Sequence, residues 1–156
     1  MQINWVLLIG LILACNLIGA LGAIWTSSDG EWYQGIKKPS FNPPSWVFAP
    51  AWTILFSLMG IALYLVLIAP SSNIKTIAMV FFGIQFILNV LWSYLFFGAN
   101  NPLASLIEIF ILLLFIIITG IYFYRVNRFA GYLLIPYFLW VSFASFLNYS
   151  IWKLNV

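Results

Sequence analysis

Residues 102–124 read PLASLIEIFILLLFIIITGIYFY, an apolar run that contains a single charged residue, Glu108. A helix needs about 20 residues to cross the hydrocarbon core of a bilayer, so a run of this length predicts a transmembrane helix. Its start is marked by Asn101, which can cap the first turn, and by Pro102, which suits the first helical position. The polar segment 125–128 follows and marks its end.

Four further apolar runs lie outside this one, at about 4–25, 46–69, 75–97 and 129–152, each long enough to span. The chain is 65% hydrophobic and only 6% charged, whereas roughly a quarter of the residues of a soluble domain are charged. Three of the four connections are short, and only the first loop, about 26–45, is long. The sequence therefore predicts an all-α polytopic membrane protein, a five-helix bundle that forms a single domain over residues 1–156.

The residue inventory excludes several classes of function. The chain has no His and one Cys, so it cannot form a His-bearing metal cluster, a Ser-His-Asp triad, a Cys-His pair or a disulfide framework. Its six Lys and Arg residues are spread along the whole length and form no basic patch, which excludes nucleic acid as a partner. They divide three against three between the two sides of the membrane, so the positive-inside rule leaves the orientation open.

The tryptophans divide into two groups by depth. The chain is 20% aromatic and contains 8 Trp residues. Those near the predicted span ends are typical of the aromatic belt at the membrane interface, and they are Trp5, Trp25, Trp46 and Trp152. Trp52, Trp92 and Trp140 lie deeper inside the spans, so they need a different role.

Polar and small side chains share helical faces with the deeper tryptophans. In lipid a polar side chain needs a partner or a cavity, so these faces are expected to point inward. Spacings of three and four residues define three stripes, namely Gln85, Asn89, Trp92 and Phe96; Trp140, Ala144 and Asn148; and Trp52, Phe56, Met59 and Leu63. Helix packing with amide groups as cross-links explains such stripes. A flat apolar ligand with a few polar edges would also suit them.

Three other features constrain the bundle. Glu108 is a candidate proton carrier or cation partner, and a protonated or interface-reaching carboxyl is the alternative interpretation. The small side chains of Cys15, Gly19 and Ala23 allow close backbone approach, either inside the bundle or across a dimer. Pro136 cannot donate a hydrogen bond to the carbonyl four residues earlier, which predicts a bend in the last span.

Three motifs carry a resemblance to a known family. They are WYQGIKKPSFNPPSWVFAPAW at 32–52, QFILNVLWSYLFFG at 85–98 and PYFLWVSFASFLNYSIWKLN at 136–155. The first motif contains four prolines that prevent a continuous helix, and a long, stiffened loop of this kind could cap a cavity. Together they closely resemble the TspO/MBR family of tryptophan-rich sensory proteins, over essentially the whole chain.

The resemblance implies a five-helix bundle, often a homodimer, whose cavity beneath the first loop binds porphyrins, haem-like tetrapyrroles, sterols and benzodiazepine-type ligands. Carried over position by position, it implies that the ligand-binding residues are Tyr33, Pro44, Trp52, Phe56, Asn89, Trp92, Trp140 and Ala144. Trp52 and Trp140 match two tryptophans implicated in bacterial relatives in the light- and oxygen-dependent breakdown of protoporphyrin IX, with the indoles as electron donors. Such a reaction needs no acid, base or metal, so no cofactor is expected beyond the porphyrin itself.

The chain departs from the family pattern at some positions. Phe41 stands where the family usually has Trp, and Val80 and Ile84 occupy a pair of positions that are small in relatives, which argues against a dimer built on that motif. A proposed cholesterol pattern is satisfied by Leu147, Tyr149 and Lys153. In a bacterium with little sterol, Tyr149 and Lys153 would instead serve as interface anchors.

Two classes of function follow from these observations. The first is a tetrapyrrole-binding sensor or scavenger in a bacterial cell membrane, with photochemical turnover left open. The second is a transporter that moves porphyrin, sterol or another amphiphile across the bilayer.

Overall fold

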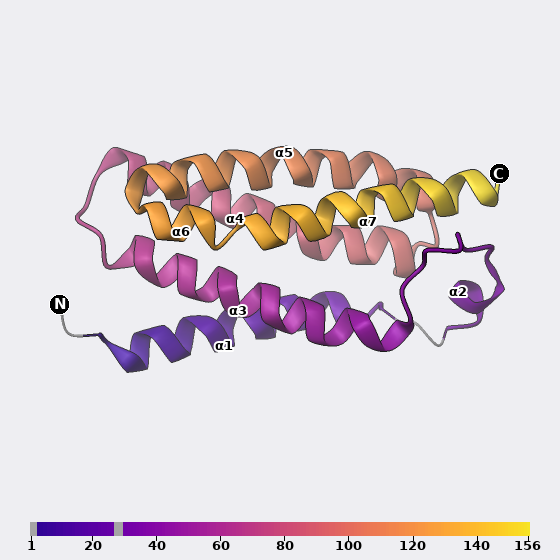
Figure 1. Ribbon diagram of the computed structural model, residues 1–156, viewed down its shortest axis with the longest axis horizontal. Helices are drawn as coiled ribbons and strands as arrows, with labels where there is room; N and C mark the ends of the chain where they lie inside the picture. Colours follow the sequence, from indigo (N-terminus) through magenta and orange to yellow (C-terminus); the bar gives the residue numbers. More distant parts are fainter. Residues whose placement is uncertain (1–2, 27–29) are drawn as a thin grey trace.

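The computed structural model describes residues 3–26 and 30–156, so residues 27–29 of the predicted first loop lie outside the described residues. Its long helices run side by side, with the first loop and the C-terminus at one end and the N-terminus at the other (Figure 1). Five helical segments are long and apolar enough to cross a membrane, and they are Trp5–Ala23, Ser45–Leu67, Asn73–Gly98, Pro102–Val126 and Arg128–Leu154. The predicted all-α membrane fold is confirmed. We call the two ends of the bundle the loop end and the turn end, the latter containing the turn at 68–72.

The elements follow the predicted spans closely. In chain order they are α1 (Trp5–Ala23), α2 (Glu31–Gly35), η1 (Ser45–Val47), α3 (Phe48–Leu67), α4 (Asn73–Ser93), η2 (Tyr94–Gly98), α5 (Pro102–Val126), α6 (Arg128–Tyr132) and α7 (Ile135–Leu154). The short helix α2 lies within the first loop. Side-chain oxygens cap the starts of α1, α4, α5 and α6, and they belong to Asn4, Ser72, Asn101 and Asn127. Each cap satisfies a backbone N–H that the helix itself leaves without a partner.

The last span is interrupted, as the position of Pro136 predicts. Helix α6 ends at Tyr132 and α7 begins at Ile135, so that Pro136 lies in the first turn of a new helix. In that position its missing N–H leaves no hydrogen bond unmade. The interruption falls just before the residues of α7 that face the bundle interior.

The end of α4 widens into a single π-helical turn, η2. The Ala99 N–H donates to the carbonyl of Tyr94 at 2.7 Å, and the Asn101 N–H donates to that of Leu95 at 3.1 Å. Such turns hold one residue more than an α-helical turn and are frequent at functional sites. Here the turn carries Phe96 and Phe97 at the loop end.

Small residues bring α1 close to α3. A Cβ atom on Gly60 would lie only 2.6 Å from the Cα atom of Ile12, so only glycine permits this approach. Gly19 lies directly against the ring of Phe56, and Cys15 is buried. Cys15 and Gly19 of the predicted small-residue stripe therefore pack inside the bundle, whereas Ala23 is exposed. A homodimer stays a prediction.

Exposure separates three of the four tryptophans predicted for the membrane interface from the deeper group. Trp46 is 74% exposed, Trp5 61% and Trp25 36%, whereas Trp52, Trp92 and Trp140 are half-buried. Trp152 is also half-buried and packs against the core, so it differs from the other three.

Candidate ligand cavity

A cavity of about 350 Å³ lies at the loop end, between α1, α3, α4 and α7 and beneath α2. This volume falls within the range of small-molecule sites. Of the predicted ligand-binding residues, those that line it are Tyr33, Trp52, Phe56, Asn89, Trp92, Trp140 and Ala144. Pro44 does not line it; this residue is exposed and lies at the N-cap of η1, next to Ser45, which does line the cavity. We refer to this space as the ligand cavity.

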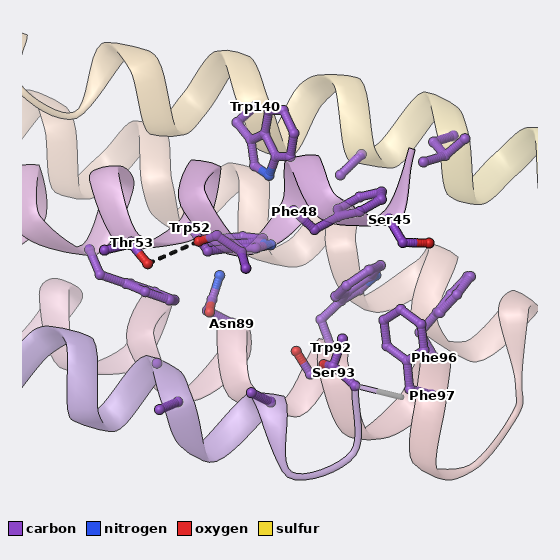
Figure 2. Close-up of a pocket in the computed structure, with 18 of the residues that line it drawn as sticks. Ser45, Phe48, Trp52, Thr53, Asn89, Trp92, Ser93, Phe96, Phe97 and Trp140 are labelled. Carbon is purple, nitrogen blue, oxygen red and sulfur yellow. Dashed lines mark hydrogen bonds between the residues drawn. The ribbon is translucent and has the colours of Figure 1, made fainter. Parts of the chain in front are cut away.

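Aromatic rings from α3 and α7 form one wall of the ligand cavity. Trp52 stacks on Phe56 with ring centroids 5.3 Å apart and an interplanar angle of 22°. Trp140 extends from α7 toward Trp52, as Figure 2 shows, and the two indoles meet edge to face at 6.5 Å and 86°. Phe48 packs edge to face on Trp140 at 6.1 Å. Two flat faces of different orientation are therefore available to an apolar guest.

The three cavity indoles differ in their hydrogen bonding. The Trp92 Nε1–H donates to Asn148 Oδ1 at 3.1 Å, and the Asn148 amide donates to the Pro102 carbonyl at 2.8 Å. Within the described residues, the indole N–H groups of Trp52 and Trp140 donate to no acceptor. Trp92 is thus fixed in place, while Trp52 and Trp140 each keep a free donor beside the cavity.

A buried polar cluster, formed by Gln85, Asn89 and Tyr137, joins the cavity to the interior of the bundle. Asn89 Nδ2 donates to the Tyr137 hydroxyl at 3.1 Å, and this hydroxyl donates to Gln85 Oε1 at 3.0 Å. Tyr137 is 1% exposed, and Asn89 reaches the cavity. Both hydrogen bonds of this cluster join buried groups, so together they fix the position of the Asn89 amide.

Tyr33 of α2 forms part of the roof of the ligand cavity. Its ring lies 5.5 Å from that of Phe97, its hydroxyl donates to Asn42 Oδ1 at 3.3 Å, and Lys38 Nζ lies 4.5 Å above the ring centroid. Burial raises the pKa of the Tyr33 phenol above its usual range, and the hydrogen bond to Asn42 opposes that shift. The roof therefore combines an apolar inner face with a basic outer one.

A pair of hydrogen bonds attaches this roof to the end of α7. The Lys37 N–H donates to Asn155 Oδ1 at 2.9 Å, and Asn155 Nδ2 donates to the Lys37 carbonyl at 2.9 Å. Asn155 Nδ2 also donates to the carbonyl of Ile151 at 2.7 Å. We call this arrangement the latch, since one side chain holds the backbone of the first loop against α7.

The predicted sterol residues do not share one surface. Leu147 is buried and lines the ligand cavity, whereas Tyr149 is 41% exposed and Lys153 is exposed. Residues two apart on a helix point about 200° from one another, which explains the separation of Leu147 from Tyr149. Sterol binding through these three residues stays a prediction.

Sequence reasoning missed several residues around the cavity. Tyr137 is the most important, although it lies on the same face of α7 as Trp140, three residues away. Phe48 and Phe97 were missed because they are common residues in spans rich in phenylalanine. The wall formed by α1 and the residues just after it was also missed, and it consists of Asn16, Gly19, Ala20 and Ala23 of α1 together with Thr26. The small side chains of α1 were the only feature of the sequence that indicated this wall.

These features define an integral membrane protein of five spanning helices with an aromatic, ligand-sized cavity beneath its first loop. The chain belongs to the TspO/MBR family, whose pattern it matches over residues 11–153. A bacterial cell membrane is consistent with its bacterial relatives.

Named relatives are similar along nearly the whole chain. It is 47% identical over 143 residues to the tryptophan-rich protein TspO of Chlorobaculum tepidum, covering 90% of each chain. It is 44% identical over 153 residues to the protein of the same name in Archaeoglobus fulgidus, covering 97% of this chain and 99% of that one. It is 33% identical over 154 residues to the translocator protein of Homo sapiens, covering 97% and 91%.

Proposed function

We propose that this protein binds protoporphyrin IX or a similar flat tetrapyrrole in the ligand cavity and acts as a sensor or scavenger of it. The observation that carries the proposal is the pair of indoles, Trp52 and Trp140, at 86° with both N–H donors free. A flat apolar macrocycle gains from stacking on indole faces, and its polar edge can accept from indole N–H groups.

The charges around the roof support an acidic tetrapyrrole as the guest. Lys37 and Lys38 lie in the first loop beside Tyr33, and neither forms an ion pair within the described part of the chain. Carboxylate side chains of a porphyrin would lie near these ammonium groups while its ring entered the apolar cavity. Benzodiazepine-type ligands would compete for the same aromatic wall.

Light-dependent breakdown is part of the proposal. A photoexcited porphyrin accepts one electron from the indole of Trp52 or Trp140, which leaves a porphyrin radical anion and an indole radical cation. Dioxygen from solution adds across a carbon–carbon double bond of the reduced macrocycle, and the extra electron returns to the indole radical cation. The O–O bond and the ring C–C bond of this adduct then break to leave two carbonyl groups. One porphyrin and one dioxygen thus give one ring-opened product, the indole is regenerated, and light and dioxygen are the co-reactants. No acid, base or metal in the chain takes part in these electron transfers.

The test combines a binding titration with illumination. Protoporphyrin IX is expected to quench tryptophan fluorescence of the purified protein in a saturable way, and its own absorbance is expected to fall under light in the presence of dioxygen. Trp52→Phe and Trp140→Phe should still bind, somewhat more weakly because each loses one indole N–H donor, and at saturating porphyrin each should lose part of the photochemical rate. The double variant should lose most of it, because phenylalanine stacks but is a poor electron donor. Trp46→Phe, which changes an exposed tryptophan outside the cavity, is the matched control and should behave as wild type.

Absence of saturable quenching would contradict the binding proposal. Wild-type rates of porphyrin loss in both cavity variants would contradict the photochemical part alone. The alternative function, transport, is favoured by the presence of a buried acid inside a span, Glu108. It predicts porphyrin flux into sealed vesicles in the dark, and vesicles that show none under saturating porphyrin would exclude it.

A further inference from the structure

Glu108 is the most anomalous residue in the bundle. It lies within α5 and is 5% exposed, and both carboxyl oxygens are buried without a hydrogen-bond partner among the described residues. Buried polar groups almost always have partners, and an acid inside a membrane span is a functional candidate by default. It does not line the ligand cavity, so the proposed function does not account for it.

No cation in the chain is positioned to neutralise Glu108. All six Lys and Arg residues are described, and none forms an ion pair with it. Lys75 Nζ donates to the carbonyls of Leu67 and Ala69, both at 2.7 Å, at the turn end. The hydroxyl of the neighbouring Ser105 donates to the carbonyl of Pro102 at 3.1 Å and is not available either. An unpaired carboxylate in this environment is costly, whereas a protonated carboxyl needs no counter-ion.

Among the titratable groups on the helices around α5, Tyr137 of α7 lies within electrostatic range of the Glu108 carboxyl, and no hydrogen bond joins the two. On α3, Tyr64 accepts a hydrogen bond from the Asn4 N–H, and on α4 Lys75 is held at the turn end. The remaining titratable or charged side chains on η2, α6 and α7 are exposed, and they are Tyr94, Arg128, Tyr132, Tyr149 and Lys153. On α5 itself, Tyr122, Tyr124 and Arg125 lie three to five turns further along the helix.

Tyr137 connects this acid to the ligand cavity. Its hydroxyl donates to Gln85 Oε1 and accepts from Asn89 Nδ2, and Asn89 lines the cavity. Hydrogen bonds to a charged acceptor are roughly twice as strong as those to a neutral one, so ionisation of Glu108 would draw the phenol O–H away from Gln85. That movement would also displace the amide of Asn89 at the polar edge of the cavity.

We infer that Glu108 is an intramembrane proton-binding site, protonated at neutral pH and coupled through Tyr137 and Asn89 to the occupancy of the ligand cavity. The carboxylate takes one proton from water to become a neutral carboxyl, and this neutral state holds the polar cluster in the arrangement described above. A ligand that contacts Asn89 in that arrangement favours the protonated state, and proton loss weakens its binding by the same factor.

The first test needs no ligand. The chain has only three acidic side chains, so infrared spectroscopy can resolve the carbonyl stretch of a single protonated carboxyl. At neutral pH the wild-type protein is expected to show this band, with the isotope shift in heavy water that marks an exchangeable proton. The band should be absent from Glu108→Gln and present in Glu31→Gln, which changes an exposed acid in the first loop and is the matched control.

Identical neutral-pH spectra for the wild type and Glu108→Gln would overturn the inference, because Glu108 would then be ionised. A missing band together with thermal stability that rises with sodium or potassium concentration would also overturn it, in favour of a bound cation. Because Gln has nearly the same shape as a protonated Glu, the variant should fold, and its melting temperature in detergent checks this.

The second test examines the coupling and rests on the proposed function. The probe is protoporphyrin IX dimethyl ester, whose esterified side chains carry no ionisable carboxyl. We expect its affinity for the wild type to fall at least about fivefold between neutral and alkaline pH, with no comparable change in Glu108→Gln. Addition of the probe should shift the Glu108 band in the wild type and in Tyr149→Phe but not in Tyr137→Phe.

The two kinds of failure are distinguishable. If the probe does not bind, the proposed function fails while the ligand-free band still tests the proton site. If it binds with the same pH dependence in the wild type and in Glu108→Gln, or shifts the band equally in Tyr137→Phe, the coupling is overturned.

Discussion

At the turn end of the bundle Phe82 stacks on Phe123 with ring centroids 5.4 Å apart and an angle of 14°, whereas at the loop end Trp52 meets Trp140 at 6.5 Å and 86°. Around the first pair, small residues such as Ala78 and Ala130 are fully buried and let the helices approach closely. Around the second pair the helices enclose a cavity of about 350 Å³. The first pair is packed inside the core, while the second lines a cavity that is more enclosed than the open hollow on the surface of α5 and α6 at the turn end.

Aromatic content alone therefore does not make a binding site. Both ends are rich in aromatic residues, and Phe56 and Phe86 continue the ring contacts from one to the other at 5.7 Å. Stacked and edge-to-face pairs occur at both ends, so what differs is the first loop, which covers one end of the bundle and roofs the cavity there. Substitutions at the turn end should therefore change stability, and those at the loop end should change binding.

The largest effect is expected from Phe123→Ala at the turn end. Phe123 is 0% exposed and stacks on Phe82, so its removal leaves a void that the close-packed helices cannot fill. We expect a loss of about 3–5 kcal/mol in the free energy of unfolding, measured by denaturation in detergent. Phe110→Ala, on the lipid-facing side of the same helix at 58% exposure, should change little. Equal losses of stability in both variants would contradict the claim that close packing around Phe123 stabilises the turn end.

The next effect is expected from Ala144→Phe at the loop end. Ala144 lines the ligand cavity, and a phenyl ring there would occupy the space between the indoles. Porphyrin affinity should fall about 100-fold, which corresponds to about 2.7 kcal/mol, while the melting temperature stays close to that of the wild type. Fluorescence quenching measures the first quantity and a thermal melt the second. Ala14→Phe, at an exposed position of α1, is the control, and similar affinities in the two variants would place the ligand elsewhere.

A smaller effect is expected from Asn155→Ala, which removes the latch. Two hydrogen bonds to Lys37 are lost, and each contributes about 1 kcal/mol in a partly exposed setting. The first loop should open more often, so the association and dissociation rates of porphyrin should both rise in stopped-flow measurements. Asn73→Ala, an exposed asparagine at the turn end, provides the control. Unchanged rates would show that the latch does not limit ligand entry.

The smallest effect concerns Tyr33 and alkaline pH. Because burial raises the pKa of this phenol in the folded protein, the unfolded chain releases the proton first as the pH rises past the ordinary value of about 10. Stability from this group is therefore present below that value and is lost as the pH rises through the folded-state pKa. Tyr33→Phe should flatten this alkaline loss in a pH series of thermal melts. A series with the same slope as the wild type would show that Tyr33 does not contribute.

The sequence predicted the spans and most of the cavity wall because both depend on local patterns. Apolar length identified five spans, and spacing of three and four residues brought Trp52, Asn89 and Trp140 to inward faces. Pro136 marked the interruption before α7 for a local reason as well, its missing N–H. The family resemblance then added Tyr33, which has no helical stripe of its own.

What the sequence did not predict depends on the register between helices. Tyr137 bridges Gln85 and Asn89 only because α7 meets α4 at one particular height, and no pattern within either helix specifies that height. The exposed position of Pro44 depends likewise on how the first loop turns before α3. The same limitation applies to Glu108. The sequence placed it inside a span, but it did not show that the carboxyl oxygens have no hydrogen-bond partner.

The π-helical turn at Tyr94–Gly98 bears on how this bundle can change over generations. Because such a turn holds one residue more than an α-helical turn, deletion of one residue there would restore ordinary helical geometry without shortening the span appreciably. Because the turn already absorbs that residue, the same deletion would leave α4 close to its present register. Its effect would be confined to the placement of Phe96 and Phe97 at the roof.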